Sequence, residues 1–304
     1  MTLPIKLRHL EAFVEVARQR SIQKAAHALH ISQPAVTKTM RELEESLKVT
    51  LYEREGRGIR LSNHGEVFLR HAGAALVSVR QGLDSVSGGS AGELQAIRVG
   101  ALPTVSSLIM PRAIELLLQE QPERRVRIVT GENAAILEQL RQGELDVVVG
   151  RLAATELMVG LSFEHLYSEA VRFVVRPRHP LSRATGSVLE RIADHLVLMP
   201  TPASIIRPYV DRLLLANGVP AFPRQIETVS DTFARAFLRT NDAIWIISAG
   251  VVANDLTDGT LVALPVDTTE TSGPVGLTMR ADGPIRPGTE LLARAIRAAS
   301  RHGA

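Results

Sequence analysis

Polar side chains at helical spacing within residues 21–41 are suited to contact the edges of DNA bases. Ser21 and Ser32 each occupy a position typical of a helix N-cap, with the His30-Ile31 turn between the two helices that they would start. Pro34 falls in the first turn of the second helix, where its missing N–H leaves no hydrogen bond unmade. That helix should run to about residue 47, and its polar start could enter a major groove. Contacts to bases or phosphates would come from Gln33, Thr37, Lys38 and Arg41, and Ser21, Ser32 and Pro34 are assigned to the same DNA-binding site.

Two further arginines lie in a strand–turn–strand pattern that follows this helix. Residues 51–54 and 58–61 flank Glu55-Gly56-Arg57, a spacing typical of a wing. Arg54 and Arg57 could bind the phosphate backbone or an adjacent minor groove. An ordinary three-helix bundle with a short loop would have a similar pattern, so spacing alone leaves both interpretations open.

Apolar spacing predicts the elements that hold this motif in place. Leu7, Leu10 and Phe13 recur at helical spacing and predict a first helix, and a long helical stretch is expected from about residue 66 to residue 87. The Gly- and Ser-rich segment 87–92 then marks a domain boundary.

Beyond this boundary the pattern changes to alternating strands and helices. Strands are expected at about 96–100, 126–129, 146–150, 172–175, 197–199 and 244–247, and helices at about 105–119, 133–142, 205–216 and 231–239. Such alternation predicts parallel sheets in two α/β lobes with a cleft between them. Trp245, the only tryptophan, is expected in the core beside the hinge, with the cleft wall as the alternative.

Hydroxyl side chains in segment 103–107 could bind a carboxylate in that cleft. The segment joins the end of a strand to the start of a helix, where free backbone N–H groups and the helix dipole favour negative charge. Plain helix capping would account equally well for Thr104 and Ser106.

The composition limits the remaining possibilities. With 304 residues, 45% of them hydrophobic, the chain is long enough for at least two folded domains. It shows no signal peptide and no apolar run long enough to cross a membrane, so we expect a cytoplasmic protein. Residues 1–70 carry a formal charge of +4, which fits a polyanionic partner, although a solvated charged surface explains it nearly as well.

No constellation for catalysis or metal binding stands out in the sequence. Cysteine is absent, which excludes disulfides, thiolate metal sites and cysteine nucleophiles. Residues 88–92 match the Gly-x-Ser-x-Gly pattern, but a nucleophile elbow requires a preceding strand and a helix is expected there. The histidines are scattered, and His165, His179 and His195 are interpreted as surface or hinge residues. We therefore expect no enzyme, no metal site and no cofactor.

Residues 6–65 resemble the DNA-binding domain of LysR-type transcriptional regulators, and the order of elements resembles that family over essentially the whole chain. The matching residues are Ala25-Ala26, Leu29, Ser32-Gln33-Pro34-Ala35, Leu43-Glu44, Leu47, Leu51 and Arg54. Thr37, Tyr52 and Lys48 depart from the family pattern, which usually has serine, phenylalanine and glycine there. A left-handed cap at Lys48 would cost on the order of 1 kcal/mol without altering the DNA-binding face.

The resemblance implies a fold class and a division into domains. It implies a multidomain α/β protein with an N-terminal winged helix-turn-helix at 1–65, a linker helix and hinge at 66–93, and an effector-binding domain at 94–304. The effector-binding domain would have two α/β lobes, as in type 2 periplasmic-binding proteins. Lobe I would cover about 94–166 plus 268–304, and lobe II about 167–267.

The resemblance also implies effector contacts and partners. The implied contacts are Thr104, Val105 and Ser106, Asn133 in the matching loop of the second strand–helix unit, and Thr201, Ser204 and Arg207 on the other lobe. Arg207 is the expected counter-charge, because a guanidinium can hold a carboxylate with two parallel hydrogen bonds, and a surface ion pair is its alternative role. The implied partners are double-stranded promoter DNA, a small-molecule effector, further copies of the chain in a homodimer or homotetramer, and RNA polymerase, with no membrane.

Four stretches are similar to one branch of the family, which controls protocatechuate catabolism: residues 53–59, 65–73, 99–105 and 130–133. This narrower likeness implies an activator of aromatic catabolism whose effector is a carboxylate such as carboxymuconate. A regulator of sugar uptake or of another pathway is the alternative within the family. A cytoplasmic two-lobed solute-binding protein or enzyme is the alternative outside it.

Overall fold

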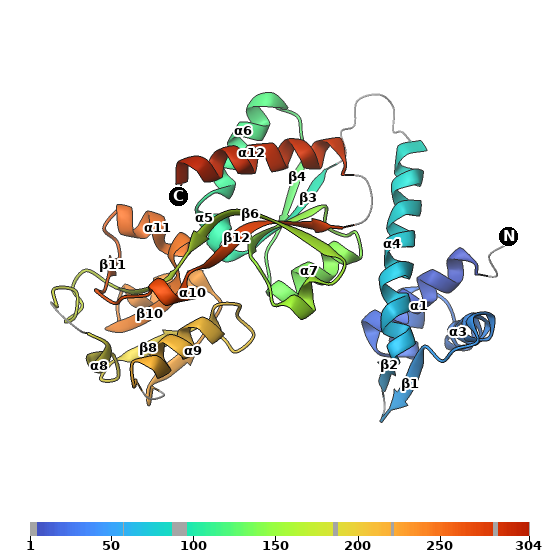
Figure 1. The fold of residues 1–304 in the computed structure, drawn as a ribbon, viewed down its shortest axis with the longest axis horizontal. Coiled ribbons are helices and arrows are strands. Elements are labelled where there is room, and N and C mark those ends of the chain that lie inside the picture. The colour runs from blue at the N-terminus through green and yellow to red at the C-terminus, as the bar shows by residue number, and fades with distance from the viewer. Residues whose placement is uncertain are drawn as a thin grey trace. The chain divides into compact units, whose positions relative to one another are not determined.

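A computed structural model describes residues 5–56, 58–86, 96–184, 188–219, 222–281 and 285–303 of the chain (Figure 1). Arg57 and the predicted linker segment 87–92 lie outside these residues. The chain divides into an N-terminal unit, residues 1–93, and a C-terminal unit that holds nearly all of residues 94–304.

The N-terminal unit consists of three helices, a two-stranded hairpin and a long helix. These elements are α1 (Leu7–Gln19), α2 (Ile22–Ala28), α3 (Gln33–Leu47), β1 (Tyr52–Glu55), β2 (Gly58–Leu61) and α4 (Asn63–Val86). Their apolar faces meet in one core around the fully buried Phe13, Met40 and Leu43. The rings of Phe13 and Phe68 lie 5.2 Å apart where α1 packs on α4. This is the predicted winged helix-turn-helix.

Local side-chain chemistry sets the helix boundaries in this unit. The hydroxyl oxygens of Ser21 and Ser32 accept hydrogen bonds from the backbone N–H groups of Lys24 (3.3 Å) and Ala35 (3.4 Å), which confirms both predicted N-caps. At its other end α3 stops at Lys48, whose φ of 56° is left-handed. The left-handed cap is therefore present although the residue is not glycine.

Two five-stranded sheets form the C-terminal unit, one in each lobe. The lobe I sheet has the strand order β4-β3-β5-β12-β6, and the lobe II sheet has the order β11-β7-β10-β8-β9. Lobe I contains β3 (Ile97–Ala101), α5 (Pro103–Ser107), α6 (Met110–Glu120), β4 (Val126–Val129), α7 (Asn133–Arg141), β5 (Val147–Arg151), η1 (Thr155–Met158), β6 (Leu161–Glu169), β12 (Gly273–Arg280) and α12 (Pro287–Gly303). Lobe II contains β7 (Val171–Val175), α8 (Leu189–Ile192), β8 (Leu196–Met199), α9 (Arg207–Ala216), β9 (Gln225–Glu227), α10 (Asp231–Leu238), β10 (Ala243–Ser248), α11 (Ala249–Thr257) and β11 (Val262–Ala263), and η2 (Thr269–Thr271) leads back to lobe I.

Antiparallel strands distinguish both sheets from the parallel arrangement that the alternating pattern predicts. β12 pairs antiparallel with β5 and β6, and β10 pairs antiparallel with β7. The predicted helix at 105–119 is in fact two helices, because Pro111 in the first turn of α6 has no N–H to continue α5. The strands β6 and β12 and the helices α11 and α12 had no counterpart among the predicted elements.

Each lobe has its own apolar core. In lobe I the helices α6 and α12 pack together on one face of the sheet (Figure 1) around Leu117, Leu277 and Ile296. In lobe II, Trp245 is 2% exposed and packs with α10 and α11, so its predicted place in the core is confirmed.

Candidate functional site

The start of α3 presents the candidate DNA-binding face. Val36, Met40 and Leu43 are buried in the core, so the other side of the helix faces solvent. On that side Gln33, Pro34, Lys38 and Arg41 are exposed and Thr37 is half-buried.

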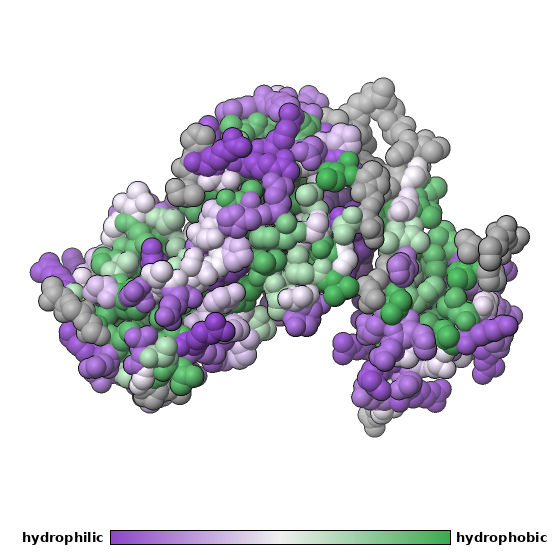
Figure 2. Space-filling view, in the orientation of Figure 1, coloured by the Kyte–Doolittle hydropathy of each residue, from purple (hydrophilic) through white to green (hydrophobic). Residues whose placement is uncertain are grey.

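The side chains of this face make few contacts within the protein. The Thr37 hydroxyl donates to the Gln33 carbonyl oxygen (3.0 Å), and the Lys38 ammonium lies 4.0 Å from the Glu42 carboxylate with 80% of its side chain exposed. The side chains of Arg41 and, on β1, of the exposed Arg54 make no hydrogen bond or ion pair to another described residue. Hydrophilic residues cover the visible surface around the β1–β2 hairpin (Figure 2). The exposed guanidinium groups of Arg41 and Arg54 can therefore donate hydrogen bonds to phosphates and base edges.

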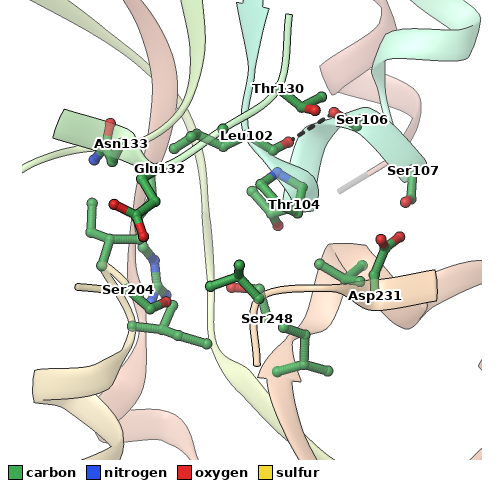
Figure 3. A pocket seen from close by; sticks show the side chains of 18 of the residues that line it. Leu102, Thr104, Ser106, Ser107, Thr130, Glu132, Asn133, Ser204, Asp231 and Ser248 are labelled. Carbon is green, nitrogen blue, oxygen red and sulfur yellow. Dashed lines mark hydrogen bonds between the residues drawn. The ribbon is translucent and has the colours of Figure 1, made fainter. Parts of the chain in front are cut away.

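A cavity of about 430 Å³ lies between the two lobes of the C-terminal unit (Figure 3). Lobe I contributes α5 and the loop before it, the loop before α7, and the end of β5. Lobe II contributes residues 203–206, the start of α10 and the β10–α11 junction. The volume falls within the range of about 300–1,000 Å³ that is usual for small-molecule sites.

Four of the predicted effector contacts line this cavity, namely Thr104, Ser106, Asn133 and Ser204. Figure 3 shows Thr104 and Ser106 on one side of the cavity and Ser204, Asp231 and Ser248 on the other. The lining does not include Val105, Thr201 or Arg207. Val105 is fully buried in the lobe I core, and the Thr201 hydroxyl is buried with no hydrogen-bond partner in the described part of the chain.

Two of the backbone N–H groups at the start of α5 are not free, which corrects part of the expectation for segment 103–107. Those of Val105 and Ser106 both donate to the Leu102 carbonyl oxygen at 3.1 Å. The Ser106 hydroxyl donates to the carbonyl oxygens of Leu102 (3.1 Å) and Ala101 (3.3 Å). These bonds close the single turn of α5, so the N–H groups of Val105 and Ser106 are not available to a ligand.

The charge of Arg207 is already used inside lobe II, which corrects its expected role as a free counter-charge. Its guanidinium donates to the carboxylates of Asp211 (2.8 Å) and Glu227 (2.7 Å) and to the Pro200 carbonyl oxygen (2.9 Å). The hydrogen bond to Glu227 is the main cause that raises the pKa of Arg207. Arg207 therefore has the ion-paired role that was its alternative.

Arg151, the cation that does line the cavity, was not predicted from the sequence. It is the last residue of β5 and is 3% exposed. Its Nη2 group donates to the carbonyl oxygens of Glu169 and of Thr271, the latter at 2.9 Å, and its guanidinium carbon lies 5.1 Å from the centre of the Tyr209 ring. Burial lowers the pKa of Arg151. An arginine directly after four buried residues of a strand, at the carboxyl end where α/β proteins bind ligands, was the available signal.

Glu169 is a second functional candidate that was not predicted from the sequence. This buried carboxylate accepts a hydrogen bond from the Thr104 hydroxyl and, at 3.0 Å, one from the backbone N–H of Gly250. It joins α5 of lobe I to α11 of lobe II at the point where the chain passes from β6 to β7. Gly250 permits this approach, since a Cβ atom there would lie 2.6 Å from the Thr104 carbonyl oxygen.

His179 is buried, which corrects its interpretation as a surface or hinge residue. It is 2% exposed, its Nδ1 accepts a hydrogen bond from the Leu181 backbone N–H (3.0 Å), and its ring lies 4.6 Å from that of His195. His165 is exposed, as predicted. The part of the chain that the structure describes contains no cluster of three or more metal-ligating residues, and none of its helices is long and apolar enough to span a membrane.

Comparison with known families matches both units of the chain. The model for the LysR substrate binding domain matches residues 90–301, and the model for the bacterial regulatory helix-turn-helix protein of the lysR family matches residues 7–66.

Individual relatives are similar over nearly the full length. The HTH-type transcriptional regulator PcaQ from Agrobacterium fabrum is 62% identical over 97% of this chain and 95% of its own. The uncharacterised regulator YdcI from Escherichia coli K12 is 36% identical over 96% of this chain and 95% of its own.

Solved structures share the fold. A full-length OxyR variant from Pseudomonas aeruginosa has a TM-score of 0.65 at 23% identity, covering 98% of this chain and 97% of its own. Full-length BenM has a TM-score of 0.56 at 24% identity, with the same coverage. The chain belongs to the LysR family and is a DNA-binding transcription regulator similar to PcaQ rather than an enzyme.

Proposed function

We propose that this regulator activates genes of protocatechuate catabolism in response to a small carboxylate such as carboxymuconate. The observation that carries the proposal is the 62% identity to PcaQ, which extends over both the DNA-binding unit and the effector domain. The cavity between the lobes supports it, because a volume of about 430 Å³ accommodates an acid of this size.

In this proposal the exposed face of α3 reads promoter DNA. Gln33 and Arg41 are free to contact base edges in a major groove, and Lys38 and Arg54 to contact phosphates. A homodimer formed through α4, and a tetramer formed through the effector domains, would pair these faces on a pseudo-palindromic site. In the same proposal, the DNA-bound regulator activates transcription by contacting RNA polymerase.

The effector acts through the relative position of the lobes. Thr104 and Ser106 belong to lobe I and Ser204 and Ser248 to lobe II, so a ligand that contacts both sides favours one degree of closure. It can shift the equilibrium only by the difference between its affinities for the two states.

The test is thermal unfolding of the full chain with carboxymuconate, protocatechuate and a set of sugars, followed by operator binding with the ligand that acts. A ligand at 100 times its Kd stabilises the folded protein by about 2.7 kcal/mol, which moves the transition measurably. A shift with carboxymuconate is the expected result. A shift with a sugar alone would keep the regulator and reject the protocatechuate pathway.

A further inference from the structure

Arg151 differs from every other lysine and arginine that the structure describes, because it alone is buried. Its Nη2 group is bonded to two backbone carbonyl oxygens, whereas its Nε and Nη1 atoms have no hydrogen-bond partner among the described residues. Buried charged groups are stable when they are paired and hydrogen-bonded. The described chain therefore supplies no acceptor for two of the nitrogen atoms of this guanidinium, and a bound ligand could supply one.

The carboxylate that acts electrostatically on Arg151 is engaged elsewhere. Glu169 uses one oxygen for the Thr104 hydroxyl and the other for the Gly250 N–H, and only its backbone carbonyl binds Arg151. The Tyr209 ring, 5.1 Å away, attracts the cation but offers its N–H groups no acceptor in their plane.

Arginines elsewhere in the C-terminal unit show what complete pairing looks like here. Arg207 binds the carboxylates of Asp211 and Glu227, Arg235 binds those of Asp231 and Asp255, and Arg297 binds those of Glu164 and Glu290. These residues are more exposed than Arg151 and need pairing less. Only the arginine in the cavity wall lacks a carboxylate among these four.

Two carboxylates line the cavity along with Arg151, and neither pairs with it. Asp231 binds Arg235 at 2.7 Å. Glu132 is exposed, points into the cavity (Figure 3) and has no ion pair with a described residue. Of the two lining carboxylates, Glu132 is therefore the one that could compete with an anionic ligand for Arg151.

We propose that Arg151 binds the anionic group of the effector, directly or through one ordered water, and thereby restricts the cavity to organic anions. The inference rests on the proposed function in taking this cavity as the effector site. Leu102, Ile206, Ile247 and Val251 would face the rest of the ligand, which favours an unsaturated or aromatic body over a polyol.

The experiment is isothermal titration of the full-length protein with three probes: 3-carboxymuconate, cis,cis-muconate and the neutral diamide of muconate. Replacing Arg151 by Gln should lower the affinity for both anions about 10- to 100-fold, because a hydrogen bond to a charged group is lost, and should leave binding of the diamide unchanged. Arg151→Lys keeps the charge and should lose less. Arg207→Gln, the matched control, should stay within about twofold of the wild type, because its charge is already paired.

Glu132→Gln tests the internal competitor. If the anion binds Arg151, removing a nearby negative charge should strengthen anion binding about two- to fivefold. If Glu132 itself pairs with Arg151 when ligand binds, the same change should weaken binding, and that result would overturn the proposal.

The remaining outcomes separate this inference from the proposed function. Equal anion affinity in the wild type and Arg151→Gln would overturn the inference, as would failure of both anions to bind the wild type. Arg151-dependent binding of muconate without any response to carboxymuconate would support the inference and reject the proposed pathway. Operator binding without ligand and the unfolding curve of each variant show that it is folded, and Arg151→Lys supplies a second variant if Arg151→Gln is unstable.

Discussion

The N-terminal unit and the C-terminal unit hold their positive charges in different surroundings. On α3 the side chain of Lys38 is 80% exposed and Arg41 is exposed without an ion pair to a described residue. In the cavity wall of the C-terminal unit, Arg151 is 3% exposed. Exposed charges are screened by salt and suit a long polyanion, whereas a buried charge is screened little and suits one small anion.

This difference implies that substitutions in the two regions affect different properties, DNA binding in one and stability in the other. Replacing Gln33 or Arg41 on the exposed face of α3 should alter DNA binding and leave stability intact, because neither side chain makes a hydrogen bond or ion pair with a described residue. A change among the buried groups of the C-terminal unit should alter stability first, because those groups have fixed neighbours.

The largest effect is expected from replacing Gln33 and Arg41 together by alanine. Each base contact that is lost costs about 1–3 kcal/mol, so operator affinity should fall about 30-fold or more while the unfolding temperature stays unchanged. Fluorescence anisotropy with labelled operator measures the first and calorimetry the second. Arg112→Ala removes an exposed arginine of α6 as a control and should bind normally. Unchanged operator binding by the double variant would show that the exposed face of α3 does not bind DNA, and the contrast drawn between the two units would be wrong.

A pH effect of up to about 3 kcal/mol is expected from His179. Burial, with a smaller contribution from His195, lowers the pKa of folded His179 to about 4, against about 6.5 in the unfolded chain. Between these values the unfolded chain binds the extra proton, so stability is fully present above about pH 6.5 and is lost as the pH falls toward 4. Urea unfolding monitored by Trp245 reports the C-terminal unit alone, since this is the only tryptophan.

The control for this pH effect is a second histidine of the same unit. His179→Gln should flatten the loss of stability between pH 6.5 and 4, whereas replacement of the exposed His165 should not. Equal slopes for the wild type and His179→Gln would mean that the buried ring does not govern the acid sensitivity of this unit.

A destabilisation of about 1–3 kcal/mol is expected from Gly250→Ala, because overpacking displaces groups that have no room to move. The new Cβ would lie 2.6 Å from the Thr104 carbonyl oxygen and 3.0 Å from the Glu169 carboxylate. The Trp245 signal should report the loss. Gly131→Ala is the matched control, since its Cβ would come no closer than 3.5 Å to any neighbour. Equal stability of the two variants would show that the Thr104–Glu169–Gly250 contact tolerates separation.

Local signals explain how much of the fold could be predicted from the sequence. The helix-turn-helix was predicted almost residue by residue, because the N-caps at Ser21 and Ser32 and the apolar spacing of α3 lie within a few positions of what they determine. The strand β12 was missed because it pairs with β5, more than a hundred residues earlier in the chain. No local sequence pattern predicts such a distant strand partner.

The same distinction explains the cavity. Thr104 and Asn133 line the cavity because each lies in the first turn of a helix that follows a strand of lobe I. The strand–helix alternation of the sequence predicts such positions at one edge of the sheet. Arg207 has one partner that local spacing could have indicated, Asp211 four residues on in α9, and a second, Glu227 of β9, that is twenty residues away in sequence. The pairing with Glu227 depends on the sheet topology and could not be predicted from local sequence.

The smallest effect is expected at Lys48, where a departure from the usual glycine was visible in the sequence. The residue ends α3 with a φ of 56° and is exposed, so a glycine would relieve backbone strain without leaving a cavity. Lys48→Gly should stabilise the N-terminal unit by about 0.5–1 kcal/mol, measured by calorimetry. Lys48→Ala removes the same charge and keeps the strain, so it should give no gain. If both variants stabilise equally, the charge of Lys48 and not its backbone limits stability, and the exposed surface of this unit is less tolerant than its lack of contacts implies.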